Sequence, residues 1–283
     1  MSHDHNPQAG QMGDASMART LAHQAEAIWP QELRLFDRYA LSGPLRILDL
    51  GCGTGEITRR LALRYPQAHL VGVDILDSNL ALARRDNAGF EERVRFDQGD
   101  AFALDFNDAR FDLVVCRHVS QAVPRFGSVM DEIDRVLKPG GWLHLLSEDY
   151  GMLHMPVIGG RDPDRFWNQN AIVFLQGIGC DGRIGRHTPP LLEQRGYREI
   201  AMEFITVDTL RVPRHVFAGI MRAWRDGYAG PLADATGRDL ADVTADFDAM
   251  IEAIETPPHY AVWHVPVVSG QKPAAPRTPG AWR

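Results

Sequence analysis

Short apolar runs alternate with amphipathic stretches along the first half of the chain. Five runs have the length and the aliphatic content of buried strands: 46–50, 69–73, 94–96, 111–116 and 142–146. Three stretches between them repeat apolar residues at helical spacing: 56–65, 77–87 and 127–137. Ser128 is the predicted N-cap of the third helix. This alternation predicts the α/β fold class, with a mostly parallel sheet wound on both faces.

The flanking regions are less regular. Between 17 and 39 the spacing predicts two short helices that are separated at Pro30. After 150, helices are predicted near 163–177 and 189–194, and two helical stretches within 213–255 are separated by Gly227, Gly230 and Pro231. Further strands are predicted at 199–210 and 260–268, which brings the sheet to seven strands. The excursions 151–184 and 211–258 are predicted to cap the carboxyl edge of the sheet.

The pattern suggests four regions. Residues 1–45 are expected to be a flexible tail followed by the N-terminal helices, and 46–150 a ligand-binding core. Residues 151–270 would supply the cap insertions and the remaining strands of the same domain. The proline-rich segment 271–283 reads as a second flexible tail. His3 and His5, in the first tail, are expected to be solvated rather than bound to a metal.

Composition narrows the class of protein. The chain has 283 residues, 45% of them hydrophobic, which is enough for one core and a smaller cap. It has 30 basic and 37 acidic residues, and the basic ones are scattered, which disfavours a nucleic-acid partner. The three cysteines Cys52, Cys116 and Cys180 form no CxxC pair, so we expect free thiols in a reducing cytoplasm. The sequence contains neither a secretion signal nor an apolar run of the roughly 20 residues that span a membrane. It leaves the oligomeric state open, a homodimer included.

A glycine-rich turn follows the first predicted strand directly. Its glycines, Gly51, Gly53 and Gly55, have the spacing GxGxG. Glycine lets the backbone approach a ligand where a Cβ would clash, and the helix that follows presents N-terminal amides. Dinucleotide enzymes use a similar turn, but their fingerprint requires Gly or Ala where this chain has Glu56. A carboxylate there would repel a pyrophosphate, which disfavours a nicotinamide oxidoreductase.

Acidic residues follow successive strands at this edge of the sheet. Asp74 ends the second strand, where a carboxylate can accept hydrogen bonds from two ribose hydroxyls, and Ile75 would lie against an adenine ring. Asp100 follows the third strand and can accept from the adenine amino group, while the amide of Ala101 meets a ring nitrogen. A single acid is more often a turn residue. Three of them around one crevice, with Asp49 at the first strand, indicate a nucleoside site.

Residues 46–150 resemble the core of the class I S-adenosylmethionine-dependent methyltransferases, especially the small-molecule branch of the ubiquinone-biosynthesis type. The resemblance rests on five motifs in order: 48–55, Asp74, Asp100, 111–118 and 137–141. It implies a Rossmann-like sheet with helical cap insertions, S-adenosyl-L-methionine as methyl donor and S-adenosyl-L-homocysteine as product. The cofactor-binding residues it implies are Asp49, Gly51, Cys52, Gly53, Gly55, Asp74, Ile75, Asp100, Ala101 and Arg117.

The acceptor side has a weaker signature, because the sulfonium is already activated and the protein's main task is to align the two reactants. A general base is needed only for an acceptor that is protonated at working pH. His118 and Glu148 follow the fourth and fifth strands and are the candidate catalytic residues, although either could be structural. The candidate acceptor-pocket residues are Gln121, Tyr150, His154, Trp167 and Tyr260.

Several functions are compatible with these residues. A small-molecule methyltransferase is favoured, with N- or O-methylation preferred over C-methylation. A protein or peptide methyltransferase would need an open groove, whereas two cap insertions suggest closure. A methyltransferase fold that binds the cofactor without transferring methyl would keep every cofactor residue. No Pro-Cys nucleophile motif surrounds Cys116, and Asp181 and His187 lack partners at a metal-binding spacing, so no metal is predicted.

Overall fold

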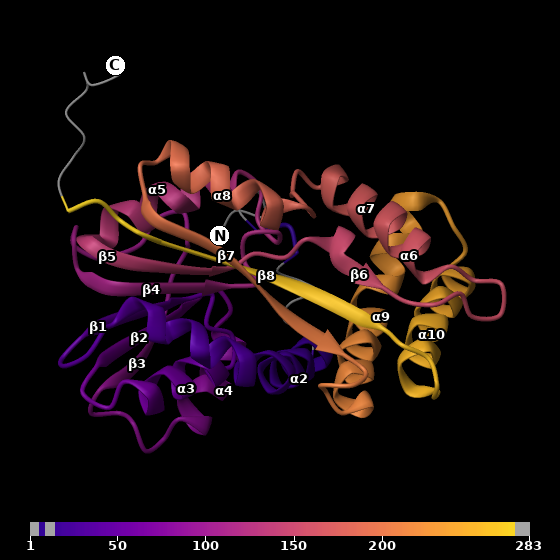
Figure 1. Ribbon diagram of the computed structural model, residues 1–283, viewed down its shortest axis with the longest axis horizontal. Helices are drawn as coiled ribbons and strands as arrows, with labels where there is room; N and C mark the ends of the chain where they lie inside the picture. The colour runs from indigo at the N-terminus through magenta and orange to yellow at the C-terminus, as the bar shows by residue number, and fades with distance from the viewer. Residues whose placement is uncertain (1–5, 9–14, 275–283) are drawn as a thin grey trace.

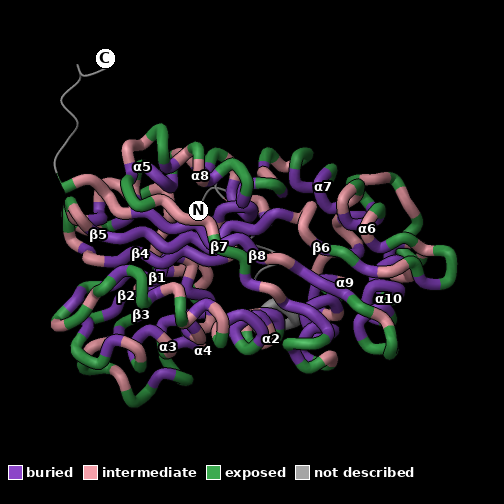
Figure 2. The backbone as a smooth tube through the Cα atoms, viewed as in Figure 1, coloured by how far each residue is buried: buried purple, intermediate pink, exposed green. Residues whose placement is uncertain are grey.

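The computed structural model describes residues 6–8 and 15–274, and within 15–18 only the backbone. A twisted sheet runs through the molecule, with helices on both sides and a helical cap at one end (Figure 1). Buried residues follow the strands and the inner sides of these helices (Figure 2). His3, His5 and the last residues of the predicted C-terminal tail lie outside the described residues.

Within the described residues the sheet has eight strands, in the order β3-β2-β1-β4-β5-β8-β6, with β7 also paired to β8. Strands β1 to β5 pair in parallel, and β8 is antiparallel to β5, β6 and β7. The prediction of seven strands was wrong because β6 has only two residues, too few to show alternation. The strands are β1 Arg46–Leu50, β2 His69–Asp74, β3 Val94–Gln98, β4 Phe111–Arg117, β5 Leu137–Leu146, β6 Leu153–His154, β7 Arg198–Asp208 and β8 Val262–Gln271.

Successive side chains along the strands point to opposite faces of the sheet and pack into two cores, one on each face. Ile47 and Val115 pack with the helices α3 (Glu56–Arg64) and α4 (Asp77–Asp86). Leu48 and Val114 pack on the opposite face, with α5 (Phe126–Val136) and α8 (Ile184–Gln194). Helices on both faces are what a mostly parallel sheet requires, so the predicted fold class is confirmed.

Two prolines that were predicted to break helices lie inside them. Helix α2 (Ala15–Glu32) contains Pro30 and continues directly into a 3-10 helix, Leu33–Tyr39. Helix α9 (Arg214–Thr236) passes through Gly227, Gly230 and Pro231 and ends only before Gly237, whose φ is +66°. A proline removes one backbone hydrogen bond, and here the packing of α2 and α9 against each other outweighs that loss.

Three predicted boundaries also moved. Helix α5 begins at Phe126, so Ser128 lies inside its first turn and does not cap it. Helix α8 begins at Ile184, and Pro189 and Pro190 lie within it rather than at its start. The segment 138–141, predicted as a turn, belongs to the beginning of β5. In each case the local signal located the element, and packing decided where it begins.

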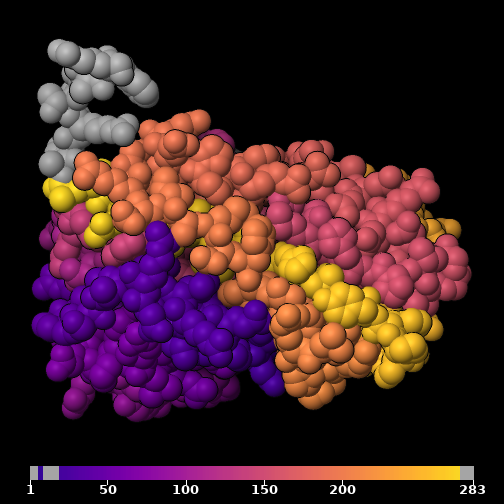
Figure 3. Space-filling view, in the orientation of Figure 1, coloured from indigo at the N-terminus to yellow at the C-terminus, as the bar shows by residue number. Residues whose placement is uncertain are grey.

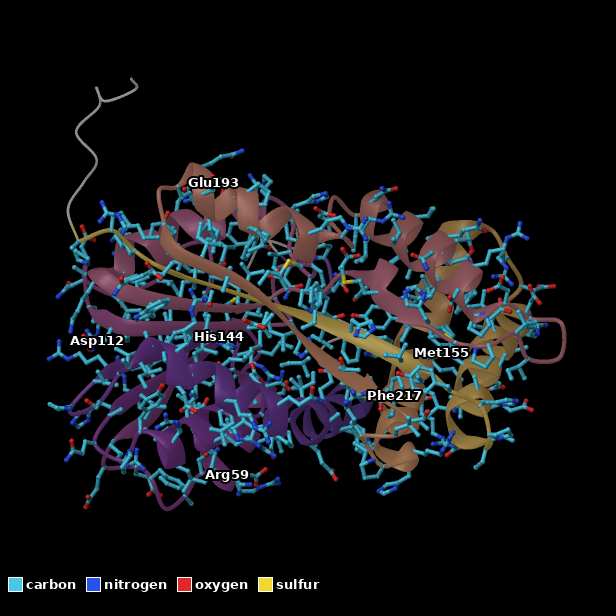
Figure 4. All side chains as sticks on the ribbon, viewed as in Figure 1. Arg59, Asp112, His144, Met155, Glu193 and Phe217 are labelled. Carbon is cyan, nitrogen blue, oxygen red and sulfur yellow. The ribbon has the colours of Figure 1, made fainter. Side chains whose placement is uncertain are left out.

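The cap lies beyond the carboxyl ends of β1, β4 and β5. Its helices share one apolar core with α2 and the adjoining ends of β7 and β8; Phe217 of α9, labelled in Figure 4, is fully buried in it. The cap helices are α6 Pro163–Phe166, a π-helix Trp167–Ala171, α7 Ile172–Gly177, α9 and α10 Leu240–Glu255.

Helix α2 connects the sheet to the cap. The Gln31 side chain donates from Nε2 to the carbonyl of Thr206 at 2.8 Å and accepts from the Thr206 amide at 3.1 Å, so it occupies the open edge of β7. In the space-filling view the N-terminal part of the chain lies directly against the late helices (Figure 3). None of the helices in the described part of the chain combines the length and the apolarity that crossing a membrane requires.

Candidate functional site

The glycine turn brings the backbone close to two neighbouring side chains. Gly51 has a φ of +75°, and a Cβ there would lie 2.3 Å from Val119 Cγ2. Gly53 has a φ of +52°, and its Cβ would lie 2.6 Å from Leu21 Cδ1 on α2. Only glycine tolerates both the conformation and the contact. Gly55 also has a positive φ but packs against α4 and β3, so it shapes the turn without lining a pocket.

A pocket at the carboxyl ends of β1, β2 and β3, which we call the strand-end pocket, holds the predicted nucleoside-binding acids. Asp74 and Asp100 line it together with Ile75 and Ala101. Asp74 Oδ2 accepts from the Gly53 amide at 2.8 Å and its Oδ1 from the Leu76 amide at 2.9 Å. Burial raises the pKa of Asp74. Each carboxylate oxygen has a second lone pair, so Asp74 can still accept from a ligand.

A smaller polar pocket adjoins the strand-end pocket on the other side of the glycine turn, and Asp49, Cys52, Glu56 and Arg117 line it. Asp49 is 2% exposed and accepts from the Thr58 hydroxyl at 2.6 Å. Burial raises the pKa of Asp49 to about 6. The pocket therefore brings a cation and two carboxyl groups to the end of β1, where a zwitterionic group would find partners for both charges.

Arg117 is held from behind by a buried acid. Its Nε donates to Glu32 Oε1 at 2.8 Å, and Glu32 also contacts His144 Nε2 at 3.0 Å (His144 is labelled in Figure 4). Glu32 is fully buried and Arg117 is 8% exposed. Arg117 Nη2 is buried without a hydrogen-bond partner among the described residues. Arg117 Nη2 can therefore donate to an acceptor oxygen that enters the polar pocket.

A third pocket, the aromatic pocket, lies between the sheet edge and the cap. Its ring walls are Tyr150, Trp167, Phe174, Trp224 and Tyr228. The Trp167 and Trp224 rings are stacked, with centroids 4.8 Å apart and planes 7° apart. Such walls exclude water and favour an apolar ligand.

His118 lines all three pockets. Its Nδ1 is hydrogen-bonded to Glu148 Oε1, which also accepts from Gln121 Nε2 at 3.3 Å. Gln121 donates to the carbonyl of His118 as well, at 3.0 Å, and the φ of His118 is +56°. His118 Nε2 is buried without a hydrogen-bond partner among the described residues. An imidazole fixed on one nitrogen by a carboxylate, with the other nitrogen unengaged, is the arrangement of a general base.

The segment 6–8 covers the strand-end and aromatic pockets. Asn6 lines the strand-end pocket, and Gln8, which is 2% exposed, lines the aromatic pocket. Gln8 Nε2 donates to the carbonyl of Ala122 at 3.2 Å, and the Tyr228 hydroxyl donates to Gln8 Oε1 at 2.8 Å. These contacts tie the N-terminus to the loop after β4 and to α9.

Comparisons with known proteins identify the family. A family model described as "Methyltransferase domain" matches residues 41–156. The demethylmenaquinone methyltransferase of Deinococcus radiodurans is 39% identical over 103 residues, which cover 36% of this chain and 43% of the relative. That of Thermus thermophilus is 38% identical over 183 residues, which cover 62% of this chain and 77% of the relative. The chain belongs to the methyltransferase family.

The fold of this methyltransferase is shared with more distant solved structures. Phosphoethanolamine N-methyltransferase 2 of Haemonchus contortus, solved with S-adenosyl-L-methionine, superimposes with a TM-score of 0.59 at 18% identity. The match covers 94% of this chain and 60% of that chain. The likeness concerns the fold. The relatives confirm the family that the glycine turn and the strand-end acids predicted.

Three of the five predicted acceptor residues line the aromatic pocket of the methyltransferase: Gln121, Tyr150 and Trp167. His154 and Tyr260, the other two, are not among the residues that line it. His154 is exposed and its Nδ1 contacts Asp164 Oδ2 at 3.0 Å. Tyr260 is 48% exposed and its hydroxyl donates to Asp208 Oδ2 at 3.2 Å. Both residues lie in or beside the cap segments, but their polar atoms contact Asp164 and Asp208.

Several residues that line the pockets of the methyltransferase were not predicted from the sequence to do so. Phe174, Trp224 and Tyr228 recur at the helical spacing of ordinary core residues, which cannot distinguish a pocket wall from a packed interior. Gln8 lies in a segment that was expected to be a flexible tail, and nothing in its surroundings indicates burial. Leu21 and Gln24 of α2 line the aromatic and polar pockets, although they were predicted only as helix residues.

Replacing Asp49 with Asn is expected to change how the stability of the unliganded methyltransferase depends on pH. The pKa of Asp49 is about 6 in the folded chain against an ordinary 3.8, so the unfolded chain releases this proton first as pH rises. Ionisation of Asp49 therefore costs stability between about pH 4 and 6, in total about 3 kcal/mol. Relative to the native chain, the free energy of unfolding of Asp49→Asn should rise by that amount from pH 4 to pH 7 in urea titrations. A difference that stays constant with pH would contradict the raised pKa.

Proposed function

We propose that this methyltransferase moves a methyl group from S-adenosylmethionine to an oxygen or nitrogen atom of a small-molecule acceptor. One observation carries the proposal. His118 lies where the strand-end and aromatic pockets meet, with one ring nitrogen held by Glu148 and the other buried without a partner among the described residues. The curated relatives named above are small-molecule methyltransferases, and the solved Haemonchus structure holds S-adenosylmethionine in the same fold.

The pockets fit the parts of S-adenosylmethionine. In the strand-end pocket Asp74 would accept from the ribose hydroxyls, Asp100 from the adenine amino group, and Ile75 would cover the ring. In the polar pocket Arg117 Nη2 would donate to the methionine carboxylate, and Asp49 would attract the amino group. The role proposed for Arg117 satisfies the donor that lacks a partner.

The residues around the reacting atoms then have distinct tasks. When bound, the sulfonium supplies an electrophilic methyl group, so the chain has to align the acceptor and exclude water. His118 Nε2 would accept the proton of the acceptor O–H or N–H, and Glu148 would stabilise the imidazolium that forms. Gln121 would fix both groups through its contacts with the His118 carbonyl and Glu148.

The enclosure of the aromatic pocket favours a free small molecule over a protein side chain. Gln8 bridges the loop after β4 and α9 and lines the pocket, which narrows the access that a peptide would need. We also propose a cytoplasmic enzyme without nucleic-acid or membrane partners. The three cysteines are free and buried, as expected in a reducing compartment, and the formal net charge is -7. Residues 46–150 would form the cofactor core of one domain that the cap completes.

The proposed carboxylate contact can be tested with a pair of ligands. Arg117→Gln alone would leave Glu32 as an unpaired buried charge, so the variant to use is Glu32→Gln/Arg117→Gln. It should bind S-adenosylhomocysteine roughly 10- to 100-fold more weakly, the value of one charge-assisted hydrogen bond. Its affinity for 5′-methylthioadenosine, which lacks the amino-acid part, should stay unchanged. Both affinities are measured by calorimetric titration.

Arg59→Gln, on the exposed side of α3, is the matched control and should alter neither affinity. If the double variant bound both ligands equally more weakly, the pocket would have collapsed. If its affinity for both ligands were unchanged, Arg117 would not belong to the site. If the native chain bound neither ligand, the proposed function itself would be wrong.

A further inference from the structure

We infer that the acceptor is an uncharged aromatic compound that is methylated on a hydroxyl group, in other words a phenol; the inference rests on the proposed function. It follows from three properties of the aromatic pocket: the charges in its lining, the orientation of its rings and the positions of its polar side chains. Each property excludes a class of acceptor or specifies a contact.

The charges in the lining exclude an anionic acceptor. The described residues that line the aromatic pocket include no lysine or arginine. Glu148 is the only carboxylate among these residues. Tyr150 and Tyr228 stay protonated, because burial raises the pKa of both hydroxyls. A carboxylate or phosphate would therefore lose its hydration without gaining a counter-ion and would face Glu148. Arg117 lines the two neighbouring pockets but not the aromatic pocket, and the proposed function assigns its Nη2 to the cofactor carboxylate.

The charges of the lining do not exclude a second class of acceptor, a protonated amine. Glu148 Oε2 is buried without a partner among the described residues and would attract such a cation. The rings disfavour this class. A cation binds over the face of an aromatic ring. Trp167 and Trp224 stack face to face, Tyr150 lies 5.0 Å from Trp167, and the Trp263 ring meets Trp224 at 5.4 Å and 76°. Because Trp167 and Trp224 each turn one face toward the other, the walls offer a cation fewer open faces. The ring edges and faces that remain suit contacts with a flat aromatic ring.

The polar side chains of the pocket match a neutral ligand with an acidic hydroxyl. The phenol O–H would donate to His118 Nε2 and transfer its proton there. The oxygen lone pair then forms the O–CH3 bond while the S–CH3 bond breaks and its electron pair stays on sulfur, giving an aryl methyl ether and S-adenosylhomocysteine. Gln8, Gln24 and Gln121 add neutral amide groups, which suit further hydroxyl or carbonyl groups on the acceptor.

Three probes on one scaffold separate the classes: naphthalen-2-ol, naphthalene-2-carboxylate and naphthalen-2-ylmethanamine. Each is titrated calorimetrically at pH 7 into the full chain saturated with S-adenosylhomocysteine. We expect naphthalen-2-ol to bind at least about tenfold more tightly than either charged probe. With S-adenosylmethionine instead, mass spectrometry should detect 2-methoxynaphthalene. If the carboxylate or the amine bound as tightly as naphthalen-2-ol, or if none of the three bound, the inference would be overturned.

Glu148→Gln tests the cause of the selectivity. Removal of the charge should strengthen binding of the carboxylate probe by roughly tenfold and leave naphthalen-2-ol within about twofold, while turnover falls. A change in packing alone would weaken the binding of all three probes by similar factors. Glu193→Gln, on the outer side of α8 (labelled in Figure 4), should change none of them. If naphthalen-2-ol bound best but no methyl ether formed, the pocket chemistry would stand and the proposed methyl transfer would fail.

Discussion

Replacing His118 with Gln is expected to lower kcat by about 10²- to 10⁴-fold near pH 7, the usual contribution of a general base. The glutamine amide can occupy the same space, but it cannot accept the proton of the acceptor hydroxyl. The affinity for S-adenosylhomocysteine should stay within about twofold, because the proposed nucleoside contacts are made by Asp74 and Asp100, which the substitution leaves in place. Single-turnover assays with naphthalen-2-ol measure the first quantity and calorimetric titration the second.

Two further measurements separate a base from a structural histidine. The rate of the His118→Gln variant should recover as the pH approaches the range where the phenol ionises on its own, since the proton no longer needs an acceptor. His187→Gln provides the matched control, because that side chain is exposed and contacts Asp181 outside the pockets. A His118→Gln variant that lost cofactor affinity in proportion to rate, with no recovery at high pH, would make His118 a cofactor contact instead.

The sequence located the residues of the strand-end pocket more accurately than those of the aromatic pocket. Gly51 and Gly53 were recognisable because their positive φ angles and close contacts exclude a side chain. Asp74 and Asp100 were recognisable because successive parallel strands end at one edge of a sheet, so the order of the elements places their ends together. These inferences need only local backbone geometry and topology, and both can be predicted from residue patterns.

The aromatic pocket depends instead on contacts between distant segments. Gln8 reaches it from the N-terminus and Tyr228 from α9, and their hydrogen bond joins positions far apart in the chain. The spacing of apolar and polar residues along the chain does not predict such a contact. The same reason applies to His154 and Tyr260, which do not line the pocket and contact Asp164 and Asp208 instead. Sequence distance from a strand end does not determine the direction of a side chain.

Helix α2 makes the N-terminal region part of the proposed cofactor site. It places Leu21 against Gly53 and Glu32 behind Arg117, and it blocks the edge of β7 through Gln31. Its uninterrupted course through Pro30 is what allows one helix to reach all three places. The predicted break at Pro30 would have separated Glu32 from Leu21, so the packing that overrides the proline also assembles the site.

Replacing Asp74 with Ala should weaken binding of S-adenosylmethionine by roughly 10²- to 10⁴-fold, since it removes two hydrogen bonds from ribose hydroxyls to a carboxylate. The chain should remain folded, because burial raises the pKa of Asp74 and the substitution removes a poorly solvated charge. Calorimetric titration measures the affinity, and thermal unfolding of the unliganded protein measures the stability. Asp97→Ala, on β3 and paired with Arg95, is the matched control and should bind normally.

Asp74 also accepts from the amides of Gly53 and Leu76, so weaker binding alone could arise from a distorted glycine turn. Adenosine and 2′,3′-dideoxyadenosine, used as competitors, separate the two causes because they differ only in the ribose hydroxyls. A ribose contact predicts that the native chain prefers adenosine and that Asp74→Ala binds both equally. A distorted turn would weaken both nucleosides and keep the preference. That result would move the ribose site away from Asp74 while leaving the carboxylate important for the shape of the turn.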